Sequence, residues 1–276
     1  MKFMSASLQF QGCSLAYEVR GAGPPVVLIQ GAGVCGSGWA PQTERLCPAY
    51  TCLTFDNRGI GASQPAAGRL TISRMAADVL ALMDGQRWES AHLVGHSMGG
   101  LIAMEVALTA PQRVRTLSLL CTFARGADAT RVTPRIAWIG LRCRLGPRNW
   151  RRRAFMELVL PPGQPPGDLP ALAERMSLLF GHDIADQPPV VMRQLAAMRH
   201  HDVTPRLKEL AGIPTLVVSA QYDMIAPPAG SEAIAAGIPN SRYVQIPNAA
   251  HSAPGLQADL INALLLEHLS GGARQK

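Results

Sequence analysis

The chain has 276 residues, of which 47% are hydrophobic and 16% are charged, and its formal net charge is +7. This length and balance suit one large globular α/β domain with an insertion. No apolar run approaches about 18 residues, and the first residues lack a signal-peptide core, so we expect a cytoplasmic protein without a membrane span. The six cysteines include no C-x-x-C pair, and no His/Cys cluster has metal-ligand spacing, which predicts reduced thiols and no metal site.

Short apolar runs alternate with segments of helical periodicity over most of the chain. The first two runs, separated by Gln11-Gly12, predict an antiparallel hairpin at a sheet edge. The predicted strands are 7–10, 14–20, 26–30, 51–55, 91–94, 114–121, 215–219 and 242–246. The helices predicted between them are 39–47, 71–86, 101–110, 228–236 and 256–269. Strands that alternate with helices predict a mainly parallel sheet flanked by helices.

The alternation stops between residues 123 and 202, where prolines recur. Helices are predicted there near 135–145, 150–160, 169–181 and 188–199. We therefore predict a core made of 1–122 and 203–276, with a helical cap at 123–202 inserted after the sixth strand. From Arg125 to Arg153 this region holds nine arginines against one acidic residue, Asp128. A solvated basic face is the ordinary explanation of such a block, and an acidic partner is the alternative.

The segment 95–99, Gly-His-Ser-Met-Gly, lies between an apolar run and a helix-forming run. This order predicts a strand, a tight turn and a helix, with Ser97 at the apex. Glycines at both ends let the strand and helix approach closely, and the helix directs its N-terminal amides at whatever the hydroxyl attacks. The pattern indicates a nucleophilic serine, although a Gly-Ser turn before a helix is also ordinary capping.

A serine nucleophile needs a base within hydrogen-bond reach and a carboxylate that orients the base. Asp223 follows the predicted strand 215–219, and His251 follows 242–246. Residues just beyond the carboxyl ends of neighbouring parallel strands gather in one crevice. Ser97, Asp223 and His251 are therefore the predicted catalytic residues.

Other interpretations of these residues stay open at the level of sequence. Asp223 could be a turn residue and His251 a helix cap, and Asp128 is an alternative acid beyond the sixth strand. His182 and Asp183, in the predicted cap, are expected to be surface groups.

The chain resembles the α/β-hydrolase fold superfamily over roughly 1–122 and 203–270. The features that carry this resemblance are the segment Gly95–Gly99, the motif Asp56-Asn57-Arg58-Gly59-Ile60-Gly61-Ala62-Ser63, Asp223 followed by a proline pair, and His251 before the last helix. The branch that it resembles contains bacterial esterases and lactonases, such as 3-oxoadipate enol-lactone hydrolases and aclacinomycin methyl esterases.

The resemblance implies a mechanism and a site. Ser97 would attack a carbonyl carbon, His251 would take and return the proton, and Asp223 would orient the imidazole. The oxyanion hole would consist of backbone N–H groups from Met98 and Ala32. The resemblance implies no cofactor.

The loop that contains Ala32 departs from the family pattern. The family usually has His-Gly at its start, whereas this chain has Gln30-Gly31. A displaced oxyanion donor costs about 10²–10³ in turnover, so the shape of this loop matters. Asp56 and Arg58 are expected to brace the turn beside it.

The cap is expected to roof a pocket that takes small to medium apolar esters or lactones. Gly31, Gly33, His96 and Trp138 are the residues expected to contact the substrate. The arginine block suggests an acidic carrier protein or an anionic lipid surface as a partner of the cap. Nucleic acid is not expected, and the oligomeric state is not predicted.

Other activities use the same three residues. They are hydrolysis of carrier-protein- or CoA-linked esters and thioesters, cofactor-free haloperoxidase or perhydrolase activity, and hydrolysis of C–C bonds. A ligand receptor that keeps the hydrolase fold is the non-enzymatic alternative. Serine at position 97 disfavours enzymes that use an aspartate nucleophile.

Overall fold

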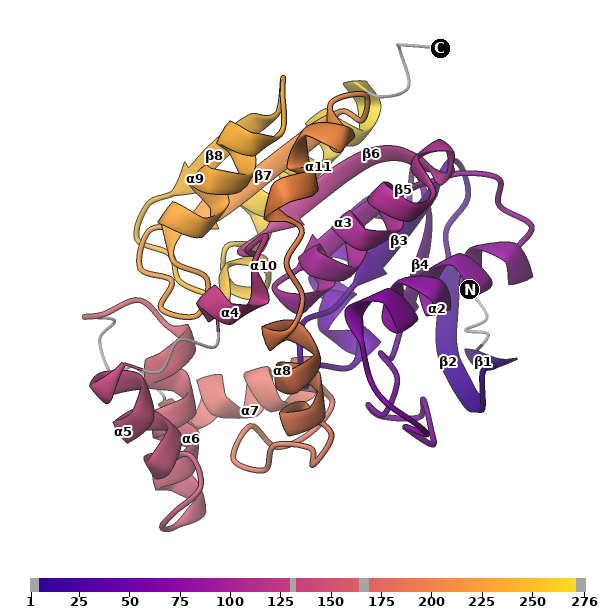
Figure 1. Cartoon of the computed structure of the whole chain (residues 1–276). Coiled ribbons are helices and arrows are strands. Elements are labelled where there is room, and N and C mark those ends of the chain that lie inside the picture. Colours follow the sequence, from indigo (N-terminus) through magenta and orange to yellow (C-terminus); the bar gives the residue numbers. More distant parts are fainter. Residues whose placement is uncertain (1–4, 130–132, 164–168, 272–276) are drawn as a thin grey trace.

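The computed structural model describes residues 5–129, 133–163 and 169–271. An eight-stranded sheet runs through the protein in the order β1-β2-β4-β3-β5-β6-β7-β8 (Figure 1). The strands are β1 (Ser5–Phe10), β2 (Cys13–Arg20), β3 (Pro25–Ile29), β4 (Thr51–Phe55), β5 (Ala91–His96), β6 (Val114–Leu120), β7 (Thr215–Ala220) and β8 (Arg242–Ile246). β2 pairs antiparallel with β1 and β4, and every other pairing is parallel. The predicted mainly parallel sheet is confirmed.

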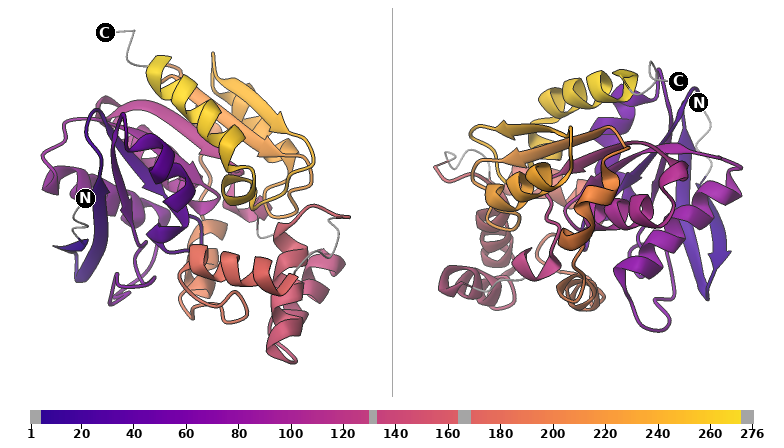
Figure 2. Two further views of the ribbon diagram at one scale, coloured as in Figure 1. Left: turned by 180° about the vertical axis from the view of Figure 1, so that it is seen from behind. Right: turned by 45° about the horizontal axis from the view of Figure 1, so that its top comes forward.

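Helices cover both faces of this sheet (Figures 1 and 2). Those of the core are α1 (Ala40–Leu46), α2 (Ile72–Gly85), α3 (Met98–Thr109), α9 (Pro228–Gly237), α10 (Ala253–Leu256) and α11 (Ala258–Gly271). Short 3₁₀ helices span Gly36–Trp39, Pro111–Arg113 and Thr204–Leu210. Buried side chains of α2, α3 and α9 form a cluster against one face, and those of α1 and α11 form a cluster against the other. Burying both faces explains why the central strands are continuous apolar runs.

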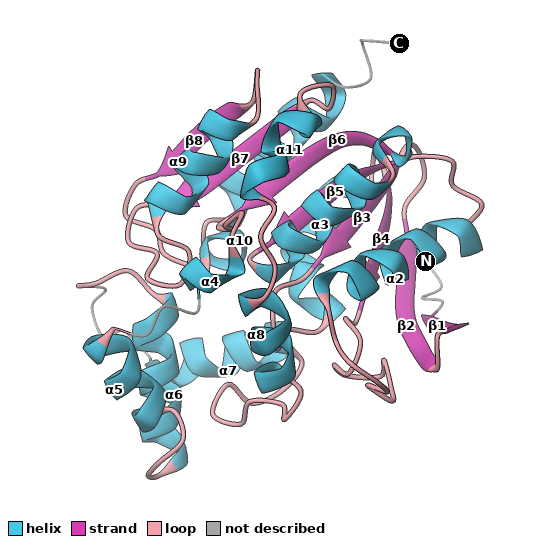
Figure 3. Ribbon diagram, in the orientation of Figure 1, coloured by secondary structure: helices cyan, strands magenta, loops and turns pink. Residues whose placement is uncertain are grey.

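The cap helices follow β6 and lie beyond the carboxyl ends of the parallel strands (Figure 3). They are α4 (Gly126–Ala129), α5 (Pro134–Arg142), α6 (Arg148–Val159), α7 (Leu169–Phe180) and α8 (Val191–Arg199). A small apolar cluster holds α6 and α7 together, and Ile225 and Leu256 of the core pack against it. The cap therefore has an apolar core of its own that is continuous with the neighbouring loops.

Several boundaries differ from the sequence prediction. The short helix α4 was not predicted, and α8 begins at Val191 because Pro188-Pro189 precede it. The final predicted helix, 256–269, is α11, which lies two residues later in the chain, and the short helix α10 before it was not predicted. Within the part of the chain that the structure describes, no helix combines the length and the apolar character needed to cross a bilayer.

A buried ion pair joins the motif 56–63 to α2. The Arg58 Nε donates to Asp78 Oδ2 at 3.0 Å, a second guanidinium nitrogen contacts Asp78 Oδ1, and both side chains are almost completely buried. Two carbonyl oxygens of the β1–β2 turn, those of Phe10 and Gln11, also accept hydrogen bonds from Arg58. Burial raises the pKa of Asp78, and the Arg58 hydrogen bonds oppose that shift. Arg58 therefore joins the hairpin, the motif and α2.

We predict that Asp78→Asn lowers the free energy of unfolding by about 3–5 kcal/mol, because it leaves the buried Arg58 charge uncompensated. The matched control is Asp84→Asn, which breaks the exposed pair between Asp84 and Arg113; we expect it to cost at most about 1 kcal/mol. Urea unfolding followed by circular dichroism measures both. Equal losses in the two variants would contradict this account.

Candidate active site

Ser97 occupies the turn between β5 and α3, in a backbone conformation with φ 55° and ψ −121°. Glycine is required on both sides of it. A Cβ on Gly95 would lie 2.3 Å from the carbonyl oxygen of Gly99, and a Cβ on Gly99 would lie 2.0 Å from that of Ile29. β5 and α3 can therefore approach closely only because the residues two positions before and after Ser97 are glycines. Ser97 is held in a strained conformation of the kind that clusters at functional sites.

Backbone hydrogen bonds fix the strained residue in place. The Ser97 N–H donates to the carbonyl oxygen of Leu120 at 3.0 Å, and the Ser97 carbonyl oxygen accepts from Thr122 Oγ1 at 2.6 Å. Thr122 is completely buried just after β6, and a Cβ on Gly100 would lie 2.4 Å from its hydroxyl. The role of Thr122 was not predictable from the sequence, because only the pairing of β5 with β6 brings this residue to the turn.

Asp223 and His251 form a buried pair. The His251 Nδ1 lies 2.8 Å from Asp223 Oδ2, and Asp223 Oδ1 accepts hydrogen bonds from the N–H groups of Ile225 and Ala226 at 2.9 and 2.8 Å. These contacts occupy both carboxylate oxygens and fix the carboxylate plane. With the proton on Nδ1, the His251 Nε2 lone pair is free to accept a proton.

His251 has no such contact with the alternative acid. Asp128 lies in α4, and it does not line the cavity that contains Ser97. The carboxylate partner of His251 in the structure is Asp223, which rules against the simple turn-residue interpretation of Asp223.

His96, next to the serine, contacts the segment that carries His251. Its Nε2 lies 3.0 Å from the His251 carbonyl oxygen, so this nitrogen carries the proton and donates it. The two imidazole rings pack with their centroids 4.7 Å apart, and the Trp39 ring meets His96 edge-on. Burial lowers the pKa of His96 to about 3. His96 is therefore a neutral ring that supports the position of His251.

A cavity of about 550 Å³ brings the predicted residues together. Ser97, His251, His96, Gly31 and Ala32 line its inner part. Its apolar lining comes mostly from the cap and includes Phe155, Leu158, Val159, Leu195, Met198 and the core residue Ile225.

Four predicted site residues lie outside this lining, and Asp223, which contacts His251 from behind, is one of them. Met98 is fully buried as the first residue of α3, so only its backbone N–H is relevant to an oxyanion. Trp138 is 59% exposed on α5 and does not line the cavity, and Gly33 does not line it either. We assign no substrate contact to the side chain of Trp138.

The loop that begins at Gln30 is held from several sides. The Gln30 side-chain oxygen accepts the Gly31 N–H at 3.2 Å, and the Gln30 carbonyl accepts from Asn57 Nδ2 at 2.8 Å. A Cβ on Gly31 would lie 3.1 Å from Ser97 Cβ, so the loop packs directly against the serine. Asp56 accepts the N–H groups of Gly36 and Ala62, in the bracing role expected of it.

Two cap residues also hold this loop, at Gly33. The Gly33 N–H donates to Gln194 Oε1 at 2.9 Å, and the Gly33 carbonyl accepts from His182 Nε2 at 2.7 Å. The expectation that His182 is a surface group is therefore wrong, because the loop after α7 folds back onto the core. Asp183, beside it, is also mostly covered; the Arg152 guanidinium that donates to it holds the pKa of Asp183 well below its usual range.

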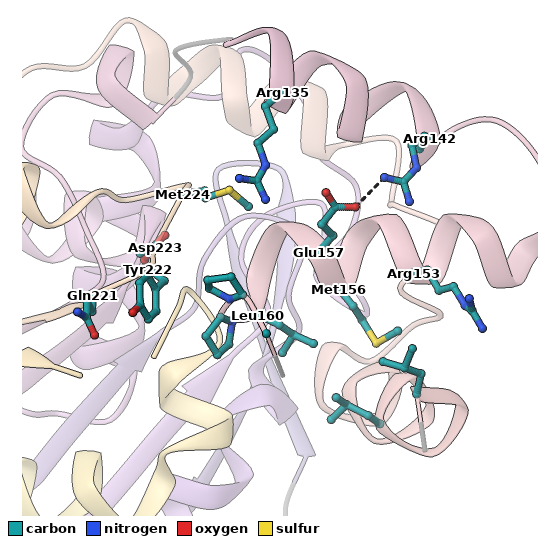
Figure 4. Close-up of a pocket in the computed structure, with 15 residues that line it drawn as sticks. Arg135, Arg142, Arg153, Met156, Glu157, Leu160, Gln221, Tyr222, Asp223 and Met224 are labelled. Carbon is teal, nitrogen blue, oxygen red and sulfur yellow. Dashed lines mark hydrogen bonds and ion pairs between the residues drawn. The ribbon is translucent and has the colours of Figure 1, made fainter. Parts of the chain in front are cut away.

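A larger hollow of about 850 Å³ lies on the other side of the segment 221–224 (Figure 4). It runs between that segment and helices α5 and α6, and it is lined by Asp223 but not by Ser97 or His251. We therefore place the site in the smaller cavity, which holds all the potentially reacting atoms except those of Asp223. Among the described residues, no group of three or more His, Cys, Asp or Glu side chains could hold a metal ion.

Comparison with known proteins identifies the fold. Residues 24–255 match the family model of the α/β hydrolase fold. The chain belongs to this family. The eight-stranded, mainly parallel sheet with helices on both faces is thus the α/β-hydrolase fold that the resemblance predicts.

Relatives in the family differ in their named activities. A protein of Azorhizobium caulinodans provisionally named carbamate hydrolase RutD is 32% identical over 91% of this chain and 93% of its own. One of Mycobacterium tuberculosis, provisionally named non-heme bromoperoxidase BpoC, is 31% identical over 92% of this chain and 97% of its own. The crystal structure of an enol-lactonase from Burkholderia xenovorans matches with a TM-score of 0.79 and 25% identity, over 96% of this chain and 99% of that one. The protein is a hydrolase whose relatives include the esterase and lactonase branch.

The histidines of β5 predict how stability depends on pH. Burial lowers the pKa of His92 to about 4 and that of His96 to about 3. Below about pH 6.5 the unfolded chain therefore binds protons that the native protein does not bind, so the protein loses stability as the pH falls.

We predict that His92→Gln, which retains a polar partner for Thr116, reduces the acid-induced loss of stability by on the order of 2 kcal/mol between about pH 7 and 4. Urea unfolding at several pH values measures this loss. The control is His200→Gln, a change at an exposed position on the cap. An unchanged pH dependence in His92→Gln would contradict the assignment.

Proposed function

We propose that this protein is a serine hydrolase that cleaves a carboxylic ester or lactone through an acyl-enzyme. The observation that carries the proposal is the buried Asp223–His251 pair, whose imidazole lines the same cavity as the strained Ser97. A carboxylate that orients a histidine beside a serine is the arrangement that activates a serine hydroxyl.

In the first step, Ser97 Oγ attacks the substrate carbonyl carbon while His251 Nε2 takes the hydroxyl proton. Asp223 stabilises the imidazolium that forms, through the contact with Nδ1. The carbonyl oxygen becomes an oxyanion, and the backbone N–H groups of Met98 and Ala32 are the proposed donors to it. Met98 begins α3, so the positive end of the helix dipole adds to this stabilisation.

In the second half of the reaction, the tetrahedral intermediate collapses and the C–O bond to the alcohol breaks. His251 gives its proton to the departing oxygen, which leaves an ester between the acyl group and Ser97. Water then attacks this ester, His251 takes a proton from the water, and a second collapse returns the proton to Ser97. For a lactone, the departing alcohol stays attached to the acyl group.

The cavity favours a small to medium apolar substrate. Its walls are mainly apolar side chains of α6 and α8. The polar lining consists of groups around Ser97 at the inner end and of Arg144, Arg151, Asp186 and Gln187 from the cap. A site of this composition takes its affinity from apolar burial and its orientation from a few polar contacts. The enol-lactonase among the structural neighbours supports the same class of substrate.

We predict that Ser97→Ala lowers the turnover of p-nitrophenyl acetate and butyrate by several orders of magnitude, up to about 10⁶. The matched control is Ser73→Ala, which removes a hydroxyl from α2 outside the cavity. Initial rates at 405 nm measure both. Equal activity in wild type and Ser97→Ala would overturn the proposed nucleophile.

We predict that Asp223→Asn lowers kcat by about 10⁴, because an amide partner favours the imidazole tautomer that cannot accept the serine proton. Asp128→Asn changes the alternative acid in the same way and is expected to leave kcat unchanged. Steady-state kinetics on p-nitrophenyl butyrate separate the two carboxylates. If Asp128→Asn lowers kcat and Asp223→Asn does not, then Asp128 is the catalytic carboxylate and Asp223 is not.

A further inference from the structure

The cap exposes an unusual number of large apolar side chains. Of the eight that are exposed among the described residues, six lie on cap helices or their turns. Trp138, Leu141 and Leu145 are spaced by three and four residues along α5 and its C-terminal turn, so they share one helix face. Ile139, on another face, is completely buried. α5 therefore has apolar residues toward the cap interior and also toward solvent.

The exposed apolar face of α5 continues onto the neighbouring helices. Trp150, 67% exposed at the start of α6, packs over the α5–α6 turn, where a Cβ on Gly146 would lie 3.4 Å from its ring. Met192 of α8 is exposed and contacts the Arg144 guanidinium through its sulfur at 2.9 Å. We call this set the cap tip: Trp138, Leu141, Leu145, Trp150 and Met192. The α5–α6 turn lies at the end of the cap that is farthest from the sheet, in Figure 1 and in the left view of Figure 2.

Arginines surround the cap tip. Residues 123–202 contain 12 arginines against seven acidic residues. Several arginines are paired within the cap: Arg142 with Glu157, Arg148 and Arg152 with Asp183, and Arg151 with Asp186.

On and between α5 and α6, three arginines have no ion pair with a carboxylate among the described residues. They are Arg135, Arg144 and Arg153, and the first and last appear in Figure 4 beside the paired Arg142. The nearby acidic side chains already form ion pairs with other arginines. The positive charges of these three arginines, around the apolar side chains, are therefore not compensated.

The active-site cavity reaches this surface. Gly140 and Arg144 of the α5 end and Met192 of α8 line the cavity and are exposed. The same cavity contains Ser97 at its inner end. The cap tip therefore adjoins the outer end of the passage to the serine.

We propose that the cap tip binds an anionic lipid surface. Exposed tryptophan and leucine side chains partition into the boundary between headgroups and acyl chains, and arginines bind anionic headgroups while their stems stay in apolar surroundings. Both kinds of side chain occur together here. Docking in this way places the outer end of the cavity at the lipid surface. The binding does not depend on the proposed function, because it involves no catalytic residue.

Charge favours a lipid surface over a second copy of this chain. A two-fold dimer through the cap tip would bring the same uncompensated arginines against each other. An anionic bilayer neutralises them instead. An acidic protein could also neutralise the arginines, and the experiment below distinguishes it by the use of protein-free vesicles.

The test is co-sedimentation of the full chain with vesicles of phosphatidylglycerol and phosphatidylcholine, compared with vesicles of phosphatidylcholine alone. We expect binding to the anionic vesicles only, and we expect it to weaken as salt rises. Leu145→Ser should weaken binding about fivefold by removing an inserted side chain. Its matched control, Leu260→Ser, changes an exposed leucine on α11 of the core and should have no effect.

A second pair of variants tests the charges. Arg135→Gln with Arg144→Gln should weaken binding about 20-fold. Arg45→Gln with Arg69→Gln removes the same charge from exposed core positions and should change binding far less. Thermal unfolding checks that every variant is folded.

Binding that requires anionic lipid and falls only in the cap-tip variants supports the proposal. It is overturned by absence of vesicle binding, by equal binding to both kinds of vesicle, or by equal losses in the control variants. If the protein does not bind vesicles and sedimentation shows a dimer that Leu145→Ser converts to monomers, the cap tip is an interface with a second copy of this chain instead.

Discussion

The close approach of β3 to the start of α3 is the constraint on which the site depends. No side chain fits at Gly99, because the Ile29 carbonyl occupies the position that its Cβ would take. This contact brings the end of β3, and the loop that follows it, against the turn that carries Ser97. The loop that begins at Gln30 and the serine are therefore positioned by the same close contact, and the hydrogen bond from Thr122 keeps the turn in its strained conformation.

The parallel sheet brings Asp223 and His251 to the side of Ser97 from distant parts of the chain. β5, β6, β7 and β8 are consecutive neighbours, so the loops after them open at one edge. Asp223 follows β7 and His251 follows β8, and the hydrogen bond between them spans 28 residues of sequence. Each residue needs only a short loop to reach the site, and short, well-bonded loops lose little precision. His96 adds a contact from the turn that carries Ser97 to the segment that carries His251.

Local patterns predicted the parts of this arrangement that depend on neighbouring residues. The glycines at 95 and 99, the apolar strands, and the positions of Asp223 and His251 after strand ends were all visible in the sequence. The contacts of Thr122, Gln194 and His182 were not, because each joins segments far apart in the chain and none has a local signature. Trp138 was expected in the pocket because it is apolar and lies in the cap. The periodicity of α5 gives two apolar faces, and sequence alone does not say which one is covered.

The Gly33 N–H donates to Gln194 of the cap, and the Gly33 carbonyl oxygen accepts from His182 of the cap. The cap therefore also stabilises a loop of the core, the one that begins at Gln30, through these two hydrogen bonds. A different cap on this core would therefore have to keep two polar side chains in the positions of Gln194 and His182, because both bond to Gly33 of the core. In this protein, a replacement of the cap would therefore also change the support of a loop that lies beside Ser97 in the core.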